Sequence, residues 1–161
     1  MPETVIAKDI HGNDYKIAVS DLRWRPSAYA IVVRDQKVLL MPEFDGYALP
    51  GGEIELGENI EAALEREVKE ETGIAVRNPR LLGAETSFFV LPGFNANGNN
   101  VQSIMLFYAC DYAGGELSDE GFDEEEKNFG GFPEWIPVNV ISNTKLVGTA
   151  NWSHYLNGTD T

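Results

Sequence analysis

The chain has 161 residues, and its 43% hydrophobic and 11% aromatic content is enough to fill the core of one globular domain. Acidic side chains number 26 against 12 basic ones, and the net charge of −14 repels phosphate polymers and makes duplex nucleic acid a poor partner. The single cysteine excludes an intrachain disulfide, and no apolar run approaches the roughly 18 residues of a membrane span. We therefore expect a cytoplasmic protein with no membrane partner, which would need bound cations to handle a phosphorylated molecule.

Two hairpins are predicted in the first part of the chain. Residues 4–7 and 15–19 flank a turn-forming cluster at 11–14, so they are expected to pair as a leading hairpin. The apolar runs 27–33 and 37–41 are separated by three polar residues and predict a second hairpin, buried in the middle of a sheet.

One helix is predicted at residues 60–72. Asn59 precedes it and can accept a backbone hydrogen bond as the N-cap, and Gly73 follows it and can adopt the left-handed backbone that ends many helices. Both boundaries are therefore marked in the sequence.

The second half of the chain predicts strands and loops. Long strands are expected at 80–91 and 101–112, joined by a loop at 92–100 that is rich in turn formers. Residues 114–131 are rich in glycine and acidic side chains and predict a mobile loop, and 134–138 predict a short closing strand. The periodicity after that strand is too weak to assign an element. Cys110, within the second long strand, is expected to be a small buried side chain rather than a nucleophile.

The predicted helix carries glutamates on its apolar side. At about 100° per residue, Glu67 and Glu71 fall on the same side as Leu64 and Val68. Two like charges four residues apart cost about 0.2–0.5 kcal/mol even in water, so a compensating charge is expected. With Glu70, they place three carboxylates within one turn, the kind of oxygen donor that Mg²⁺ or Mn²⁺ prefers. A plain solvated helix is the alternative interpretation.

The spacing around this helix supports a family assignment. Gly52 is followed after five residues by Glu58, and after seven more by an uninterrupted run from Arg66 to Ile74. This segment resembles the Nudix box of the MutT-like Nudix hydrolases, with every defining position filled. The resemblance implies an α/β/α sandwich with a central mixed β-sheet, in which the box forms a loop, a helix and a loop.

The resemblance also implies roles for individual residues of the box. The expected ligands for Mg²⁺ or Mn²⁺ are the carboxylates of Glu67, Glu70 and Glu71 and the backbone oxygen of Gly51. Arg66 is expected to orient a box carboxylate, together with Glu58, and its charge would help to keep the neighbouring acids ionised.

The family implies a small nucleotide substrate in which a nucleoside diphosphate is linked to another group. Water would hydrolyse this substrate by attack at phosphorus. Nucleoside triphosphates, ADP-ribose-like molecules and sugar nucleotides all fit this description. The general base is left open between Glu67 or Glu71 and an acid of the predicted mobile loop, such as Glu120 or Glu124. Three further residues are candidates for substrate contacts: Arg23, Arg25 and Phe94.

We predict a single domain over residues 1–161, with a hairpin extension at 1–24, a core at 25–146 and a tail at 147–161. A homodimer is expected only from the family resemblance. The rival hypothesis is a non-catalytic, nucleotide-binding regulator of the same fold. Such a regulator would normally have lost glutamates of the box, and all of them are present here.

Overall fold

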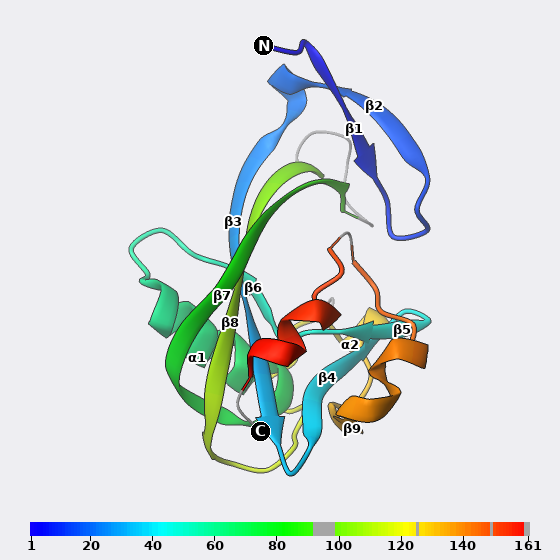
Figure 1. Ribbon diagram of the computed structural model, residues 1–161. Helices are drawn as coiled ribbons and strands as arrows, with labels where there is room; N and C mark the ends of the chain where they lie inside the picture. Colours follow the sequence, from blue (N-terminus) through cyan, green and yellow to red (C-terminus); the bar gives the residue numbers. More distant parts are fainter. Residues whose placement is uncertain (92–98, 125, 149, 160–161) are drawn as a thin grey trace.

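The computed structural model describes residues 1–91, 99–124, 126–148 and 150–159. Within these residues, nine strands form a mixed, curved sheet (Figure 1). In chain order they are β1 (Thr4–Lys8), β2 (Asp14–Ala18), β3 (Arg23–Arg34), β4 (Lys37–Glu43), β5 (Gly46–Ala48), β6 (Gly51–Glu53), β7 (Ala75–Val90), β8 (Asn100–Gly114) and β9 (Glu134–Pro137). The helices are η1 (Val19–Asp21), α1 (Ile60–Thr72), α2 (Glu126–Phe129), η2 (Val138–Asn143) and η3 (Ser153–Gly158), where η denotes a 3₁₀ helix. None of these described helices is long and apolar enough to cross a membrane.

The strands follow the order β2-β1-β7-β8-β3-β4-β5, with β6 added to β3 and β9 added to β4. At the centre, β3 runs parallel to β8, and β7 pairs antiparallel with β8. The leading hairpin β1–β2 joins the sheet through a parallel pairing of Lys8 with Phe89 of β7. The α/β class and the mixed sheet that the sequence predicts are therefore confirmed.

Each face of the sheet supports its own apolar core. Side chains of a strand alternate between faces, so neighbouring residues of β3 enter different cores. One core packs α1 against the sheet, with Leu64 and Val68 of the helix among its buried residues. The other core lies beneath the C-terminal segment, where Ile141 and Trp152 are buried. Figure 1 shows α1 behind the sheet and η3, in red, in front of it.

The predicted boundaries of α1 are confirmed. The side chain of Asn59 accepts a hydrogen bond from the backbone N–H of Ala62 at 2.8 Å, and Gly73 has φ of 76° in the left-handed region. The Lys69 ammonium also donates to the carbonyl oxygen of Gly73 at 2.7 Å, which satisfies one of the free acceptors at the helix end. The helix is therefore held at both ends by local contacts.

Some elements differ from the sequence prediction. Strand β7 begins at Ala75, earlier than the predicted residue 80, because irregular pairings along β7 and β8 let the ladder continue past Pro79. Strands β5 and β6 were not predicted, since segments of three residues show no usable periodicity. The other predicted strands and both hairpins are confirmed.

The glycine-rich acidic segment is anchored on α1 rather than detached from it. Phe122 is buried, and the backbone N–H of Ser118 donates to the carbonyl oxygen of Thr72 at 2.9 Å. A Cβ added to Gly121 would lie 2.4 Å from the carbonyl oxygen of Glu70, so this glycine allows close packing. The segment also contains the short helix α2. The mobility predicted for it stays a prediction.

The expectation that Cys110 is a small buried side chain is confirmed. Cys110 belongs to the core under α1, and burial raises the pKa of its thiol to about 12. A raised pKa keeps the thiol protonated at neutral pH, and a protonated thiol is a poor nucleophile.

Replacing Gly73 with alanine should destabilise the protein more than replacing Gly57. Both glycines have a positive φ, 76° and 87°, so each substitution carries the left-handed penalty of about 1–2 kcal/mol. A Cβ at Gly73 would in addition lie 2.3 Å from the carbonyl oxygen of Glu116, whereas a Cβ at Gly57 meets nothing within 4 Å. Urea unfolding should therefore show a lower free energy of unfolding for Gly73→Ala than for Gly57→Ala. Equal losses would contradict the tight packing at the end of α1.

Candidate functional site

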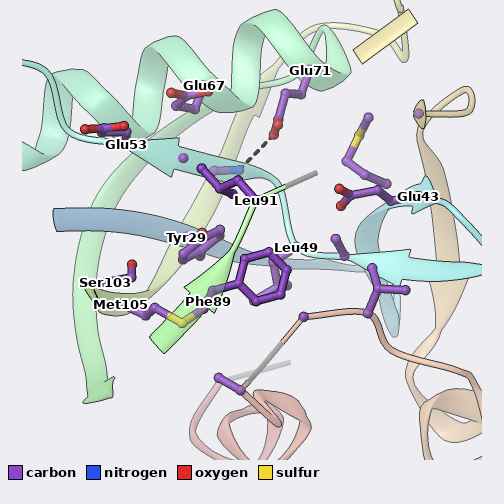
Figure 2. A pocket seen from close by; sticks show the side chains of 18 of the residues that line it. Tyr29, Glu43, Leu49, Glu53, Glu67, Glu71, Phe89, Leu91, Ser103 and Met105 are labelled. Atoms are coloured by element: carbon purple, nitrogen blue, oxygen red, sulfur yellow. Dashed lines mark hydrogen bonds between the residues drawn. The ribbon is translucent and has the colours of Figure 1, made fainter. Parts of the chain in front are cut away.

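A cavity of about 460 Å³ lies against one face of the sheet, beside the N-terminal ends of β3 and β8. Its floor consists of odd-numbered residues, because alternate side chains of each strand share a face. Among them are Arg25 and Tyr29 of β3, Ser87 and Phe89 of β7, and Ser103, Met105 and Phe107 of β8. Figure 2 shows several of these side chains, with α1 along one side of the cavity and the C-terminal segment along the opposite side.

Two glutamates of α1 reach the cavity where β6 passes beneath the helix. The backbone N–H of Gly51 donates a hydrogen bond to Glu71 Oε2 at 2.8 Å, drawn as the dashed line in Figure 2. A Cβ added to Gly52 would lie 2.8 Å from Glu67 Oε1. The two glycines therefore let the strand backbone approach both carboxylates closely, which larger residues would prevent.

Arg66 joins the acidic residues of the helix and the preceding loop. Its guanidinium donates to both carboxylate oxygens of Glu58, each at 2.9 Å, and to Glu67 Oε1 at 2.8 Å. Longer contacts of 3.4 and 3.3 Å reach Glu70 Oε2 and the carbonyl oxygen of Glu53. The hydrogen bonds from Arg66 lower the pKa of Glu58, whereas burial raises the pKa of Glu67 against the opposing effect of Arg66. The sequence-based pairing of Arg66 with Glu58 agrees with this geometry.

Only some of the predicted metal ligands lie at the cavity. Gly51, Glu67 and Glu71 line the cavity, while the side chain of Glu70 is 49% exposed and turned toward Arg66. In the part of the chain that the structure describes, no three acidic, histidine or cysteine side chains already converge as a metal site. The carboxylates on one turn still provide the hard oxygen donors that Mg²⁺ or Mn²⁺ requires.

Of the predicted substrate contacts that the structure describes, one lines the cavity. Arg25 lines the cavity and donates to Ser27 Oγ at 2.7 Å and to the Tyr29 hydroxyl at 3.3 Å. Arg23 pairs with Glu53 at 2.6 Å and is not among the residues that line the cavity. Phe94 lies outside the described residues.

The two loop acids considered as general bases are not among the residues that line the cavity. Glu120 is exposed, and Glu124 is exposed and paired with Lys127 at 3.1 Å. From the same loop, Phe122 and Asp123 line the cavity instead.

The cavity lining includes residues that the sequence did not single out, among them Ile10, Glu43 and Trp152. Ile10 belongs to the turn of the leading hairpin. The Glu43 side chain enters from β4 (Figure 2), and burial raises its pKa although the positive charge of Arg25 opposes that effect. The signal that could have identified the floor residues is the alternation along β3 and β8, whereas no local pattern marks these three.

Comparison with known families agrees with this geometry. The model of the NUDIX domain matches residues 23–155. The chain belongs to the Nudix family. The Nudix box, from Gly52 to Ile74, covers the end of β6, the following loop, α1 and the short loop after it. The loops and the helix agree with the sequence prediction, whereas the strand was not predicted.

Relatives within the Nudix family differ in what their names describe. An ADP-ribose pyrophosphatase from Methanocaldococcus jannaschii is 38% identical over 104 residues, which are 62% of this chain and 57% of that protein. An NAD-capped RNA hydrolase, NudC, from Vibrio atlanticus is 31% identical over 128 residues, 77% of this chain and 41% of that protein. The chain thus spans about half the length of these two relatives.

A solved structure supports the Nudix fold. The MutT protein from Bacillus halodurans superposes with a TM-score of 0.59 at 26% identity, and the match covers 76% of this chain and 74% of that one.

Replacing Arg66 with lysine should lower stability more than the same change at Arg80. Arg66 is 27% exposed and contacts both oxygens of Glu58 as well as Glu67, a set that one ammonium cannot reproduce. Arg80 pairs with Asp111 at the surface, where both side chains are more than 40% exposed and such pairs contribute little. Thermal unfolding at neutral pH without added metal should show the larger decrease for Arg66→Lys. Equal decreases would contradict the central role of Arg66 in this cluster.

Proposed function

We propose that this Nudix protein is a metal-dependent pyrophosphohydrolase, which acts on a small molecule containing a nucleoside diphosphate linked to another group. The observation that carries the proposal is the position of Glu67 and Glu71, which line a cavity of about 460 Å³ beside Gly51 and Gly52. That volume lies in the usual range for small-molecule sites. The complete box argues against the rival of a regulator that has lost catalysis.

The residues at the acidic end of the cavity fit a divalent cation. Glu67 and Glu71 offer carboxylate oxygens, and Glu70, on the same helical turn, can reach the site only by turning away from Arg66. The backbone oxygen of Gly51 remains a proposed ligand. When bound there, Mg²⁺ or Mn²⁺ would neutralise charge on the pyrophosphate and lower the pKa of a water molecule.

The chain's own side chains would divide the remaining tasks. Arg66 holds the Glu67 carboxylate in place through a 2.8 Å hydrogen bond, and Gly51 holds Glu71. Arg25 supplies positive charge inside the cavity, where phosphate oxygens need it. The proton of the attacking water would pass to Glu67 or Glu71, if one of them does not bind the metal, or to Asp123, the loop acid that lines the cavity.

A free nucleotide is preferred to an RNA end as the substrate. The relatives' names include both ADP-ribose and NAD-capped RNA as substrates. The net charge of −14 disfavours a long phosphate backbone, since each additional phosphate adds repulsion at long range. Of these two, ADP-ribose or another free dinucleotide-like molecule fits this chain better.

Mg²⁺ or Mn²⁺ should raise the melting temperature relative to chelator. A ligand that binds only the folded state at a hundred times its Kd adds about 2.7 kcal/mol of stability. Glu67→Gln should lose most of this increase, while Glu65→Gln, an exposed residue of the same helix, should retain it. Thermal unfolding with increasing metal concentration measures the effect. No increase in the wild type, or equal increases in both variants, would contradict the metal site.

Hydrolysis should depend on the cavity-facing glutamates. With Mg²⁺, wild-type protein should hydrolyse at least one member of a panel of nucleoside triphosphates, sugar nucleotides, ADP-ribose and dinucleoside polyphosphates. Glu67→Gln should lower kcat on the order of 100-fold or more, because electrostatic stabilisation of the transition state is lost. Glu65→Gln makes the same change of charge on the exposed face and should leave kcat within about twofold, since it touches no part of the cavity. Glu70→Gln tests the third box glutamate in the same assay. A wild-type protein without activity on the whole panel would refute the proposed reaction.

A further inference from the structure

The cavity has two chemically different ends. Glu67 and Glu71 lie at one end, beneath α1. The other end lies against the C-terminal segment and is lined by apolar side chains: Leu49, Met105, Phe107, Val147 and Ala150. A ligand that fills both ends would therefore carry its negative charge at one end and a flat, weakly polar group at the other.

One polar atom in the apolar wall has no partner. Trp152 lines the cavity and is only 3% exposed. Across residues 1–91, 99–124, 126–148 and 150–159, its Nε1 is the one buried side-chain nitrogen or oxygen that makes no hydrogen bond. A buried donor without an acceptor is rare in folded proteins and destabilises them, so it calls for an explanation.

The neighbouring contacts hold the backbone at Trp152 and the side chain of Tyr155. The backbone N–H of Tyr155 donates to the carbonyl oxygen of Trp152 at 3.0 Å, within η3. The Tyr155 ring stacks on Phe107 at 5.2 Å and occupies the space left by Gly83, where an added Cβ would lie 2.3 Å from the Tyr155 hydroxyl. The Tyr155 hydroxyl donates to Glu85 Oε1 at 3.1 Å. These contacts hold the segment that carries Trp152. The Nε1 atom itself is closed to solvent in this structure, so a ligand atom reaches it when the indole ring turns toward the cavity.

We propose that Trp152 is a specificity-determining residue, whose Nε1–H donates a hydrogen bond to an acceptor on the flat heteroaromatic group of the substrate. That group, a nucleobase in a nucleotide substrate, would occupy the apolar end while the pyrophosphate lies near Glu67. An indole N–H can only donate, so the matching ligand atom is a carbonyl oxygen or an unprotonated ring nitrogen. This assignment rests on the proposed function, because it places a nucleotide across both ends of the cavity.

Binding experiments test this inference without requiring turnover. The four ribonucleoside 5′-diphosphates and inorganic pyrophosphate are titrated by calorimetry into wild type, Trp152→Phe and Trp135→Phe. Trp135 is the matched control, because it packs against the core under α1, on the other face of the sheet. Unfolding of each variant without ligand checks that the fold is retained.

Wild type should bind at least one nucleoside diphosphate more tightly than pyrophosphate. Trp152→Phe should bind that nucleotide about 10- to 100-fold more weakly, the usual consequence of losing a buried hydrogen bond, with its affinity for pyrophosphate unchanged. Trp135→Phe should bind both like the wild type. If Trp152→Phe does not unfold cooperatively, Trp152→His and Trp152→Leu provide the comparison. Trp152→His keeps a ring N–H donor and should therefore bind the nucleotide more tightly than Trp152→Leu.

Two results would overturn the inference. One is an equal loss of nucleotide and pyrophosphate affinity in Trp152→Phe, and the other is no loss at all, which would be expected if a water molecule alone satisfies the N–H. Either result leaves the proposed hydrolysis intact if the substrate panel shows turnover that depends on Glu67. Conversely, selective nucleotide binding through Trp152 in a protein without turnover would support the inference while refuting the proposed reaction.

Discussion

The guanidinium of Arg66 supplies the positive charge that lets several acidic side chains lie close together around α1. Three glutamates, from the helix and the loop before it, are held by this one side chain, which is itself largely buried. Without that positive charge, Glu58 and Glu67 would lose the partner that they share. The carboxyl of Glu67, whose pKa burial already raises, would then be still harder to ionise. Arg66 also fixes the loop on the helix, because it reaches the backbone of Glu53 in β6. The same side chain therefore balances the charge of the box and holds its loop against the helix.

The rest of the site follows from how close β6 can come to α1. Gly51 and Gly52 bring a strand backbone against Glu71 and Glu67, and β6 in turn pairs with β3, whose alternate side chains form the cavity floor. Helix, strand and floor are thus linked through main-chain contacts. The carboxylates that we propose as metal ligands are positioned by β6 and the sheet, while the C-terminal segment lines the far end of the cavity.

The part of the structure that could be predicted from the sequence is the part governed by local interactions. Asn59 and Gly73 mark the ends of α1 because a cap and a left-handed residue act over one turn, and the apolar side of the helix follows from its period. The position of Glu67 on that side also follows. The roles of Arg25 and Phe89 in the cavity depend on the register of β3, β7 and β8, which only tertiary pairing sets. Trp152 precedes a short 3₁₀ helix, whose few residues give no periodic signal.

The leading hairpin carries the cavity wall beyond the part of the chain that matches the NUDIX domain. The NUDIX match begins at residue 23, yet Ile10, in the turn between β1 and β2, forms part of the cavity wall. A fragment trimmed to the matched region would keep every box residue and lose the part of the cavity wall that Ile10 forms. In this chain the boundary of family similarity and the boundary of the cavity are therefore different, and residues outside the shared domain help to shape the space beside the box.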